Sequence, residues 1–303
     1  MHKKRLLITG GSGFIGSRLV PVLLTQGYDV TVLTRDPDKT AVHFNQTVST
    51  VERLDTLDDS TFFDVVINLA GQGITDKRWT PATKMQLRDS RLNTTRKLIH
   101  YLQATDKKPE CLISGSAIGY YGNQGDAIVS EQVSGDSSFA SKLCFDWESE
   151  AQQAETLGIR TCFLRTGIVL GKKGGALSKM LPAFKLGLGG SMGNGGQWMS
   201  WVHIDDLIGI MLHIIKHKDI RGAVNGTAPN PVTNKDFSST LARVLKRPAF
   251  MSIPAFVLKL MLGEMAQELL LSGQRVMPEK ILAAGYVFQY AELNDALSDV
   301  VGK

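Results

Sequence analysis

The 303-residue sequence has only three cysteines and no long apolar run. Cys111, Cys144 and Cys162 are isolated from one another and form no C-x-x-C pair, which predicts neither a disulfide framework nor a metal site. No stretch approaches the roughly 18 apolar residues of a membrane-spanning helix, and no secretion signal precedes the first apolar run. We therefore expect a cytoplasmic protein without a membrane partner.

The chain also has little excess charge of either sign. Lys and Arg number 34 against 29 Asp and Glu, a net charge of +5, and the densest basic runs are short. Interspersed charges of this kind are typical of a solvated surface and not of a nucleic-acid groove. We therefore expect no nucleic-acid partner.

Glycine, by contrast, is abundant. The chain has 30 glycines, where average usage of about 7% gives roughly 21. Four of them lie within residues 10–16 and ten within 167–196. The excess is therefore local, and it points to a tight loop near the N-terminus and to a flexible stretch later in the chain.

Short apolar runs alternate with helical patterns through the first half of the chain. We expect strands at 6–8, 29–34, 64–70, 111–113 and 160–164, and helices at 14–26, 86–104 and 142–155. This alternation is typical of βαβ units, whose parallel strands form a sheet that is covered on both faces. After residue 166 the pattern weakens, and we expect helical segments at 205–217, 234–246 and 254–301.

These patterns predict an α/β fold, a Rossmann-type doubly wound parallel sheet with a smaller C-terminal substrate lobe. We place the dinucleotide-binding domain at residues 1–225 and the small lobe at 226–303, with residues 167–202 contributing to the lobe. We expect Asp205 to cap the helix at 205–217 and His203 to orient the preceding loop.

The strongest local motif is Thr9-Gly10-Gly11-Ser12-Gly13-Phe14-Ile15-Gly16, between a predicted strand and a predicted helix. Gly10 permits a tight turn, Gly13 lets a pyrophosphate approach the backbone, and Gly16 allows the helix to pack closely on the sheet. Free N–H groups at the start of the helix would hold the phosphates, which places Phe14 and Ile15 at the cofactor. The motif predicts a bound dinucleotide.

The end of the second strand predicts which dinucleotide binds. An NAD site commonly has a carboxylate about 20 residues past the glycines, where it binds the ribose hydroxyls. This sequence has Thr34 and Arg35 there, and a guanidinium can pair with a 2′-phosphate. We therefore expect NADP(H). Asp36 argues against it unless its side chain points away.

Over nearly its full length the chain resembles the extended short-chain dehydrogenase/reductases of the NAD-dependent epimerase/dehydratase family. The resemblance rests on TGGSGFIG at 9–16, NLAG at 68–71, SGSAIGYYG at 114–122, Lys142, LRTG at 164–167 and WVHIDD at 201–206. More narrowly, the chain resembles the atypical branch called epimerase family proteins, through KRW at 77–79, SRLN at 90–93 and LPAFKLGLGGSMGNGGQW at 181–198.

The resemblance implies further cofactor contacts. Leu69, Ala70 and Gly71 would pass under the adenine ribose and the nicotinamide side of the cofactor, and Leu54 would lie near the adenine. Arg91 would reach the cofactor phosphates, although a long exposed helix explains an arginine at that position equally well.

The resemblance also implies a catalytic set. In this superfamily a serine holds the substrate oxygen, a tyrosine transfers the proton, and a lysine four residues later lowers the tyrosine pKa and binds the nicotinamide ribose. Ser116 and Lys142 match the serine and the lysine, but Ser138 stands where the tyrosine is expected. A serine hydroxyl is too weak an acid to replace a phenol. Tyr120 or Tyr121 could supply the proton instead, or both could simply pack as aromatic residues.

These alternatives imply two functions. With a replacement proton donor, the chain would be an NADP(H)-dependent oxidoreductase or epimerase acting on a small carbonyl or hydroxyl substrate, free or nucleotide-linked. Without one, it would be a non-catalytic NADP-binding regulator or interaction protein, and some members of this branch are connected with cell division. Both readings imply a small-molecule partner and are compatible with a homodimer.

Overall fold

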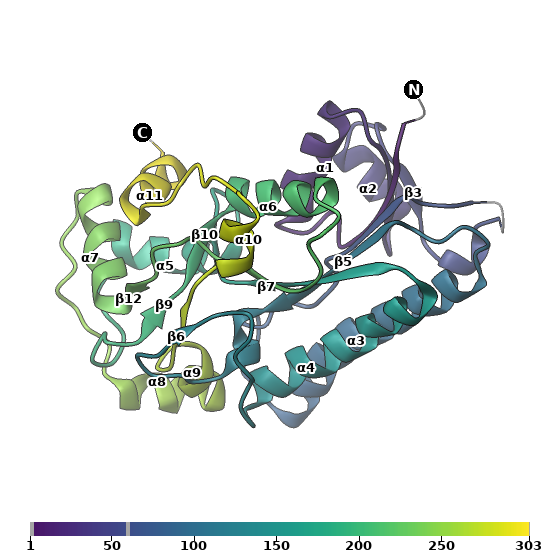
Figure 1. The fold of residues 1–303 in the computed structure, drawn as a ribbon. Helices are drawn as coiled ribbons and strands as arrows, with labels where there is room; N and C mark the ends of the chain where they lie inside the picture. Colours follow the sequence, from purple (N-terminus) through teal and green to yellow (C-terminus); the bar gives the residue numbers. More distant parts are fainter. Residues whose placement is uncertain (1–2, 59–60, 303) are drawn as a thin grey trace.

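A seven-stranded parallel sheet forms the centre of the molecule (Figure 1). In the computed structural model, which describes residues 3–58 and 61–302, the strands follow the order β11-β7-β5-β4-β1-β2-β3. The strands are β1 (Arg5–Thr9), β2 (Asp29–Leu33), β3 (Ser49–Val51), β4 (Val65–Asn68), β5 (Cys111–Ala117), β7 (Arg160–Thr166) and β11 (Gly222–Gly226). The strand order runs outward from β1 in both directions, which confirms the doubly wound Rossmann-type sheet.

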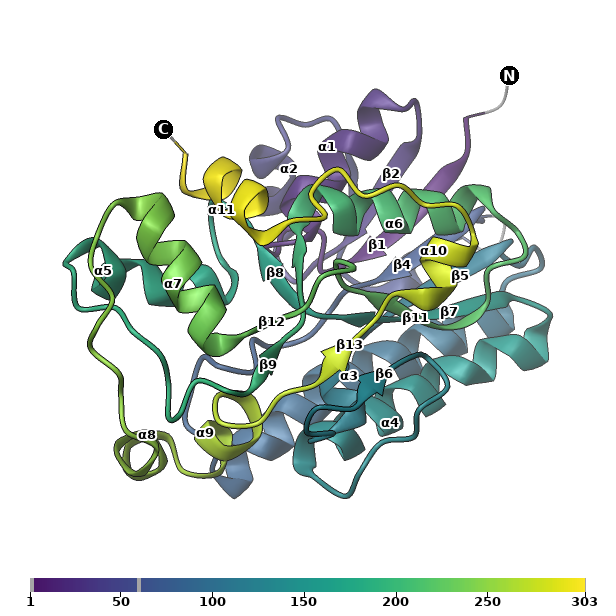
Figure 2. The same ribbon diagram turned by 60° about the vertical axis from the view of Figure 1, so that its left-hand side comes forward.

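Helices cover both faces of the sheet, as Figures 1 and 2 show. The helices α1 (Gly16–Thr25) and α6 (Ile204–Lys216) pack on one face, and α3 (Pro81–Ala104) and α4 (Phe139–Gln152) pack on the other. Neighbouring strand residues therefore enter different cores: Ile8 packs with α1 and α6, whereas Leu7 packs against α3. Burial on both faces is why the strands are continuous apolar runs without alternation.

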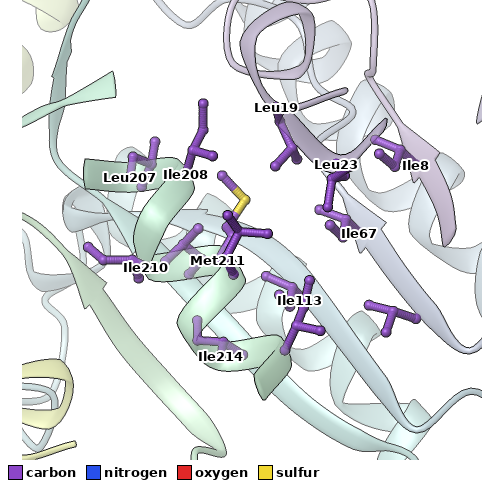
Figure 3. Close-up of a cluster of buried hydrophobic side chains, with 14 of the residues drawn as sticks. Ile8, Leu19, Leu23, Ile67, Ile113, Leu207, Ile208, Ile210, Met211 and Ile214 are labelled. Atoms are coloured by element: carbon purple, nitrogen blue, oxygen red, sulfur yellow. The ribbon is translucent and has the colours of Figure 1, made fainter. Parts of the chain in front are cut away.

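The core beneath α1 and α6 fixes the start of α1, where the glycine loop lies. Leu19 and Leu23 of α1 meet Ile8 of β1, Ile67 of β4 and Met211 of α6, and all five are fully buried (Figure 3). Contacts of this kind between close-packed apolar side chains hold α1 rigidly against the carboxyl end of β1.

Two helices begin earlier than the sequence pattern predicts, because polar residues cap them. The α3 helix begins at Pro81, and the side chain of Thr80 accepts a hydrogen bond from Thr83 N. The α4 helix begins at Phe139, and the side chain of Ser138 accepts one from Ser141 N. Ser or Thr at the N-cap, with Pro at the first helical position of α3, satisfies N–H groups that the apolar periodicity does not reveal.

A smaller lobe takes chain mainly from residues 168–203 and 232–301. Within the first stretch β8 (Ile168–Leu170) pairs with β10 (Trp201–His203), and β9 (Trp198–Met199) pairs with β12 (Val232–Thr233) of the second. The pair of β6 (Ile128–Val129) with β13 (Arg275–Val276) connects the second stretch to the segment after β5. A separate apolar core, with Trp201 and Phe237 fully buried, holds the lobe together.

The lobe helices are α5 (Gly175–Lys185), α7 (Asn234–Leu245), α8 (Ala255–Leu262), α9 (Glu264–Leu269) and α11 (Leu293–Val301). The short helix α10 (Glu279–Ala283) instead packs beside β11, and its Ile281 belongs to the core beneath α1 and α6. The segment expected to be helical at 254–301 is therefore four helices. Gly263 and Gly285 interrupt it with φ values of +62° and +80°, which a continuing helix cannot accept.

Candidate functional site

A cleft of about 1960 Å³ lies along the carboxyl ends of β1, β2 and β4. Gly10, Gly13, Thr34, Ala70 and Gly71 are among the residues that line it. The strand order reverses between β1 and β4, and ligands of doubly wound sheets bind at such a reversal. The cleft therefore lies where this fold binds its ligand.

The glycine loop forms the floor of the cleft. Gly10 has a φ of +68°, and a Cβ there would lie 2.7 Å from the carbonyl oxygen of Leu69. A Cβ on Gly16 would collide with the carbonyl oxygens of Gly10 and Gly11. Gly13 N donates to Gly10 O over 3.0 Å, and a Cβ on Gly13 would meet only that oxygen, at 3.2 Å. Gly10 and Gly16 thus shape the turn, while Gly13 leaves free space beside the backbone.

The loop also anchors the lobe, through Phe14. The ring of Phe14 lies against three glycines that follow β8, Gly171, Gly174 and Gly175, and a Cβ on any of them would come within 3.0 Å of it. Part of the glycine excess at 167–196 is therefore explained by close packing on Phe14. Ile15 forms the N-cap of α1 and packs against the core beneath that helix.

The end of β2 presents an exposed arginine to the cleft. Asp36 turns its carboxylate onto the start of α2 (Pro37–His43), where Oδ1 accepts a hydrogen bond from Lys39 N over 3.1 Å. Arg35 is exposed, lines the cleft and forms no ion pair with any residue among 3–58 and 61–302. Thr34 Oγ1 is bonded to Thr40 Oγ1 at 2.8 Å. The acid that argued against a 2′-phosphate is thus occupied as a helix cap.

A buried polar network supports the segment after β4. Asn68 Oδ1 accepts from Thr9 Oγ1 over 2.6 Å, and Ala70 N donates to the same hydroxyl over 3.1 Å. Asn68 Nδ2 donates to Thr95 Oγ1 of α3 over 2.9 Å. These bonds fix Leu69 and Ala70 opposite Gly10. The distance between the glycine loop and the segment after β4 is therefore fixed.

Arg91 braces the same segment from below. Its guanidinium donates to Gln72 O and to Leu87 O, each over 3.0 Å, and lies 5.2 Å from the centre of the Trp147 ring. Burial lowers the pKa of Arg91 from its usual value. Phosphate binding by Arg91 stays a prediction. In this structure the Arg91 side chain holds the loop at 71–73 in place. Leu54, in a short 3₁₀ turn (Leu54–Thr56), also lines the cleft.

Ser116 belongs to a buried charged cluster behind the end of β5. Its Oγ donates a 2.6 Å hydrogen bond to Glu148 Oε1 of α4. Arg165 of β7 donates to both oxygens of Glu148 over 2.8 Å, and all three residues are less than 9% exposed. Burial by itself would lower the pKa of Arg165, but the bidentate bond to Glu148 raises it above its usual value. Glu148 and Arg165 therefore form a buried ion pair in which both side chains stay charged.

The two candidate tyrosines differ in their surroundings. Tyr121 is fully buried, donates to Asn225 Oδ1 over 2.6 Å and accepts from Arg165 Nη1 over 3.1 Å. Burial raises the pKa of Tyr121 to about 12. Tyr120 is half-buried, its ring lies 3.4 Å from Arg165 Cζ, and its hydroxyl bonds to no residue that the structure describes. Of the two, Tyr120 has the hydroxyl that a ligand could reach.

Lys142 lies on the outward side of α4. Ser141, Cys144 and Glu148 face the sheet and are buried, whereas Lys142 is exposed. At about 100° per residue, a position one past Ser141 points away from the face that Ser141 and Glu148 share. Ser138, in the place of the missing tyrosine, is the N-cap of the helix. The role predicted for Lys142 at the nicotinamide ribose stays a prediction.

Sequence reasoning did not single out Glu148 or Arg165 as site residues, although one signal was available. Arg165 interrupts the apolar run of β7, and a charged residue inside a strand that is buried on both faces needs a partner. The partner could not be named, because Glu148 is 17 residues earlier, on a helix whose register against the sheet the sequence leaves open.

The turn into α6 differs from the sequence prediction. The prediction that Asp205 caps the helix is wrong, because His203 is the N-cap and its Nδ1 accepts from Asp205 N over 3.2 Å. Asp205 instead pairs with Arg18 of α1 at 2.7 Å. The positive end of the helix dipole and the guanidinium of Arg18 both stabilise the Asp205 carboxylate in the first turn of α6. The carboxylate is therefore stabilised there without serving as the N-cap.

Comparisons with known proteins match the whole chain. A family model described as the NAD dependent epimerase/dehydratase family matches residues 6–225, and a domain of unknown function, DUF1731, matches residues 253–300. Epimerase family protein YfhF of Bacillus subtilis is 39% identical over 300 residues, which are 98% of this chain and 97% of that protein. Human epimerase family protein SDR39U1 is 34% identical over 98% of this chain and 99% of that protein.

Solved structures agree with these matches. Human epimerase family protein SDR39U1 with NADPH superposes with a TM-score of 0.87 at 34% identity, over 98% of both chains. A nucleoside-diphosphate sugar epimerase from Corynebacterium glutamicum gives 0.77 at 30% identity, over 99% of this chain and 59% of that one. UDP-glucuronic acid 4-epimerase from Bacillus cereus with NAD gives 0.76 at 18% identity, over 98% of this chain and 96% of that one, and shares the fold.

Proposed function

The chain belongs to the NAD-dependent epimerase/dehydratase family, and we propose that it is an NADP(H)-dependent oxidoreductase or epimerase of a small hydroxyl or carbonyl substrate. The observation that carries the proposal is the pairing of an open glycine loop with an unpaired arginine at the end of β2. The human relative solved with NADPH, at 34% identity, supports the same cofactor.

The residues of the cleft fit a phosphorylated dinucleotide. The space beside Gly13 accepts a pyrophosphate, because a Cβ there would touch only Gly10 O. The backbone N–H groups from Phe14 to Gly16, at the positive end of α1, would bind the phosphates, since that of Gly13 already closes the turn onto Gly10 O. Thr34 and Arg35 would receive the 2′-phosphate, and Leu54 with Leu69, Ala70 and Gly71 would enclose the adenosine. NADP(H), when bound, supplies the hydride acceptor or donor.

The proposed chemistry assigns the substrate oxygen to Ser116. Because the Ser116 hydroxyl donates its one proton to Glu148, its free lone pair can only accept a hydrogen bond. Ser116 would therefore hold a substrate that carries a hydroxyl, and that hydroxyl would donate a hydrogen bond to Ser116 Oγ. Tyr120, with its unbonded hydroxyl beside Arg165, is the group that would move the proton as the hydride is transferred to or from the nicotinamide.

The substrate class is proposed from a relative. The Corynebacterium glutamicum protein of 30% identity is named a nucleoside-diphosphate sugar epimerase, so we propose a nucleotide-linked sugar as the first class to test.

The cofactor is tested by its effect on thermal stability. Saturating NADPH should raise the Tm of the wild type by about 5 °C. The variant Gly13→Ala should fold, because its methyl group meets only one backbone oxygen, but lose most of this increase. Gly196→Ala adds the same methyl group at an exposed site and should keep it. If NADPH does not raise the wild-type Tm, or raises that of Gly13→Ala equally, the proposed cofactor site is wrong.

One observation favours a second function, that of a non-catalytic NADP-binding regulator. Lys142 faces outward and Ser138 is a helix cap, so the usual tyrosine and lysine do not meet the cleft in this structure. An assay of hydride transfer with nucleotide sugars, monitored through the absorbance of reduced nicotinamide, distinguishes the enzyme from the regulator. Turnover that Ser116→Ala abolishes supports the enzyme. NADPH binding with no turnover of the nucleotide sugars supports the regulator.

A further inference from the structure

Eight large apolar side chains are exposed together at one end of the small lobe, on a surface that we call the apolar corner. They come from the segment after α5 and from the segment that contains α8. Their exposed fractions run from 42% to 77%, and the residues are Leu186, Leu188, Phe250, Met251, Ile253, Phe256, Leu260 and Met261. Single exposed apolar residues are ordinary, but a contiguous group of this size marks a surface that another molecule covers.

Backbone hydrogen bonds hold the two segments side by side. Met251 N donates to Gly189 O over 3.2 Å, and Ile253 N donates to Ser191 O over 2.9 Å. A β-bridge joins Met192 to Ile253. The apolar corner is therefore one ordered surface, and its exposure is not the fraying of a loose end.

The helix α8 carries three of the exposed apolar side chains. Only Leu258 of its eight residues is buried, and Phe256, Leu260 and Met261 all point to solvent. Figure 2 shows α8 at the lower left edge of the molecule, outside α9. A helix that is apolar on nearly all sides is normally buried in a core or a bilayer. The residues that line the cleft beside β1 and β2 include none from α8, so the cofactor would not cover it.

The unpaired charges around the apolar corner are basic, and Glu264, which follows α8, is paired with Lys84. Lys185, Lys246, Arg247 and Lys259 are exposed, and none forms an ion pair with another residue that the structure describes. The sequence has no Asp or Glu within 156–204 or within 237–263. Exposed Phe, Leu and Met side chains with lysines and an arginine around them are typical of a surface that lies in the interface of an anionic membrane.

We propose that the apolar corner docks on the surface of an anionic lipid bilayer, with Phe256 and Leu260 entering the headgroup region. A second copy of this chain is a poorer occupant, because a two-fold contact would bring the four basic side chains against their own copies. The sequence predicts no membrane partner because it has no apolar run long enough to span a bilayer. None of the helices among the described residues could span a bilayer, and the eight residues of α8 suffice only for an interfacial contact.

Vesicle flotation tests this proposal, and it is independent of the cofactor and of any catalysis. The full chain is mixed with vesicles of phosphatidylcholine alone, or of phosphatidylcholine with about one-third phosphatidylserine, and the floating fraction is measured. We expect flotation with the anionic vesicles, a weaker signal with the neutral ones, and a decrease as salt is raised.

Matched variants identify the surface. Phe256→Ser with Leu260→Ser should lower the apparent affinity by on the order of 10-fold or more, because both side chains leave the interface. Val287→Ser removes an apolar side chain that is 86% exposed outside the apolar corner, and should float like the wild type. Lys185→Glu with Lys259→Glu should remove the preference for anionic lipid. Unchanged Tm values without lipid would show that these variants fold.

Three results would overturn the proposal. These are no flotation of the wild type with anionic vesicles, equal loss in Val287→Ser, and a concentration-dependent dimer in light scattering that Phe256→Ser with Leu260→Ser abolishes. The last result would show that a second copy covers the apolar corner.

Discussion

The Ser116 hydroxyl donates a 2.6 Å hydrogen bond to the carboxylate of Glu148, inside the protein and behind the end of β5. The same carboxylate accepts two hydrogen bonds from the Arg165 guanidinium. One buried acid therefore neutralises a buried base and also fixes the hydroxyl that is proposed to meet the substrate. Stability and the proposed chemistry depend on the same side chain.

Glu148→Gln is expected to lower the free energy of unfolding by about 3–5 kcal/mol, because it leaves the buried Arg165 charge without its counterion. Urea unfolding measures the change. Glu150→Gln, two residues along the same helix, is the matched control. It breaks an ion pair with Arg96, whose side chain is 50% exposed, and should cost no more than about 1 kcal/mol. Equal effects of the two variants would contradict the assignment of Glu148 to a buried charge pair.

Tyr121→Phe and Tyr120→Phe are expected to have different effects. Removing the Tyr121 hydroxyl leaves Asn225 Oδ1 and Arg165 Nη1 without that partner, which should cost about 1–3 kcal/mol in urea unfolding. The Tyr120 hydroxyl makes no such bond among the described residues, so Tyr120→Phe should change stability by less than about 0.5 kcal/mol. In the hydride-transfer assay with nucleotide sugars, loss of rate in the stable Tyr120→Phe variant would assign the proton transfer to Tyr120. A destabilised Tyr120→Phe would show that this tyrosine is structural.

The α4 helix shows what the sequence could and could not predict. The spacing between Ser138 and Lys142 suggested a catalytic lysine by resemblance, but the periodicity of the helix itself was informative. Ala140, Trp147 and Ala151 are buried, and that apolar stripe places Lys142 on the opposite side. The local pattern thus indicates the direction of this side chain, whereas its role at the nicotinamide ribose stays a prediction.

The glycine loop is the opposite case. Its conformation follows from local contacts within eight residues and from one neighbouring strand, so its turn and its place at the cleft could be predicted from the spacing of the glycines. The contact of Phe14 with Gly174 could not, because 160 residues separate the two and the lobe decides where the second lies. Long-range pairings such as this one need the fold.

Arg35→Ala is expected to weaken NADPH binding on the order of 10-fold while NADH binding stays the same, because only the 2′-phosphate needs the guanidinium. Calorimetric titration with each cofactor measures both. Asp36→Ala should not change the preference, since its carboxylate caps α2, although it should cost about 1 kcal/mol of stability. Loss of affinity for both cofactors in Arg35→Ala would place Arg35 elsewhere on the dinucleotide.

Gly174→Ala is expected to destabilise the protein by about 1–3 kcal/mol. Gly174 has a φ of +124°, and an added Cβ would lie 2.6 Å from Phe14 Cδ2, so both the backbone and the packing resist it. Gly158→Ala is the control. It also has a positive φ, +76°, but its Cβ would meet nothing within 4 Å, and it should cost only about 1 kcal/mol. Thermal unfolding of the two variants measures how much the contact with Phe14 and the more restricted backbone of Gly174 add to the ordinary cost of a left-handed residue.

His203 is expected to make stability depend on pH. Burial lowers the pKa of His203 below its usual value, and the N-cap bond to Asp205 N needs an unprotonated Nδ1. As the pH falls below about 6.5, the unfolded chain therefore takes up a proton that the folded chain refuses. The stabilisation is complete above that pH and is lost toward lower pH, by at most about 1.4 kcal/mol per unit.

The comparison with His203→Asn measures this effect. Asparagine keeps a capping oxygen and does not titrate, so the stability of the wild type relative to this variant should decrease as the pH is lowered from 7 to about 5. Urea unfolding at each pH gives the difference. Asp299 Oδ2 lies 3.3 Å from His203 Nε2 and could instead favour the protonated histidine. If the stability of the wild type relative to His203→Asn increases as the pH falls, this ion pair outweighs burial and the N-cap bond, and the prediction is wrong.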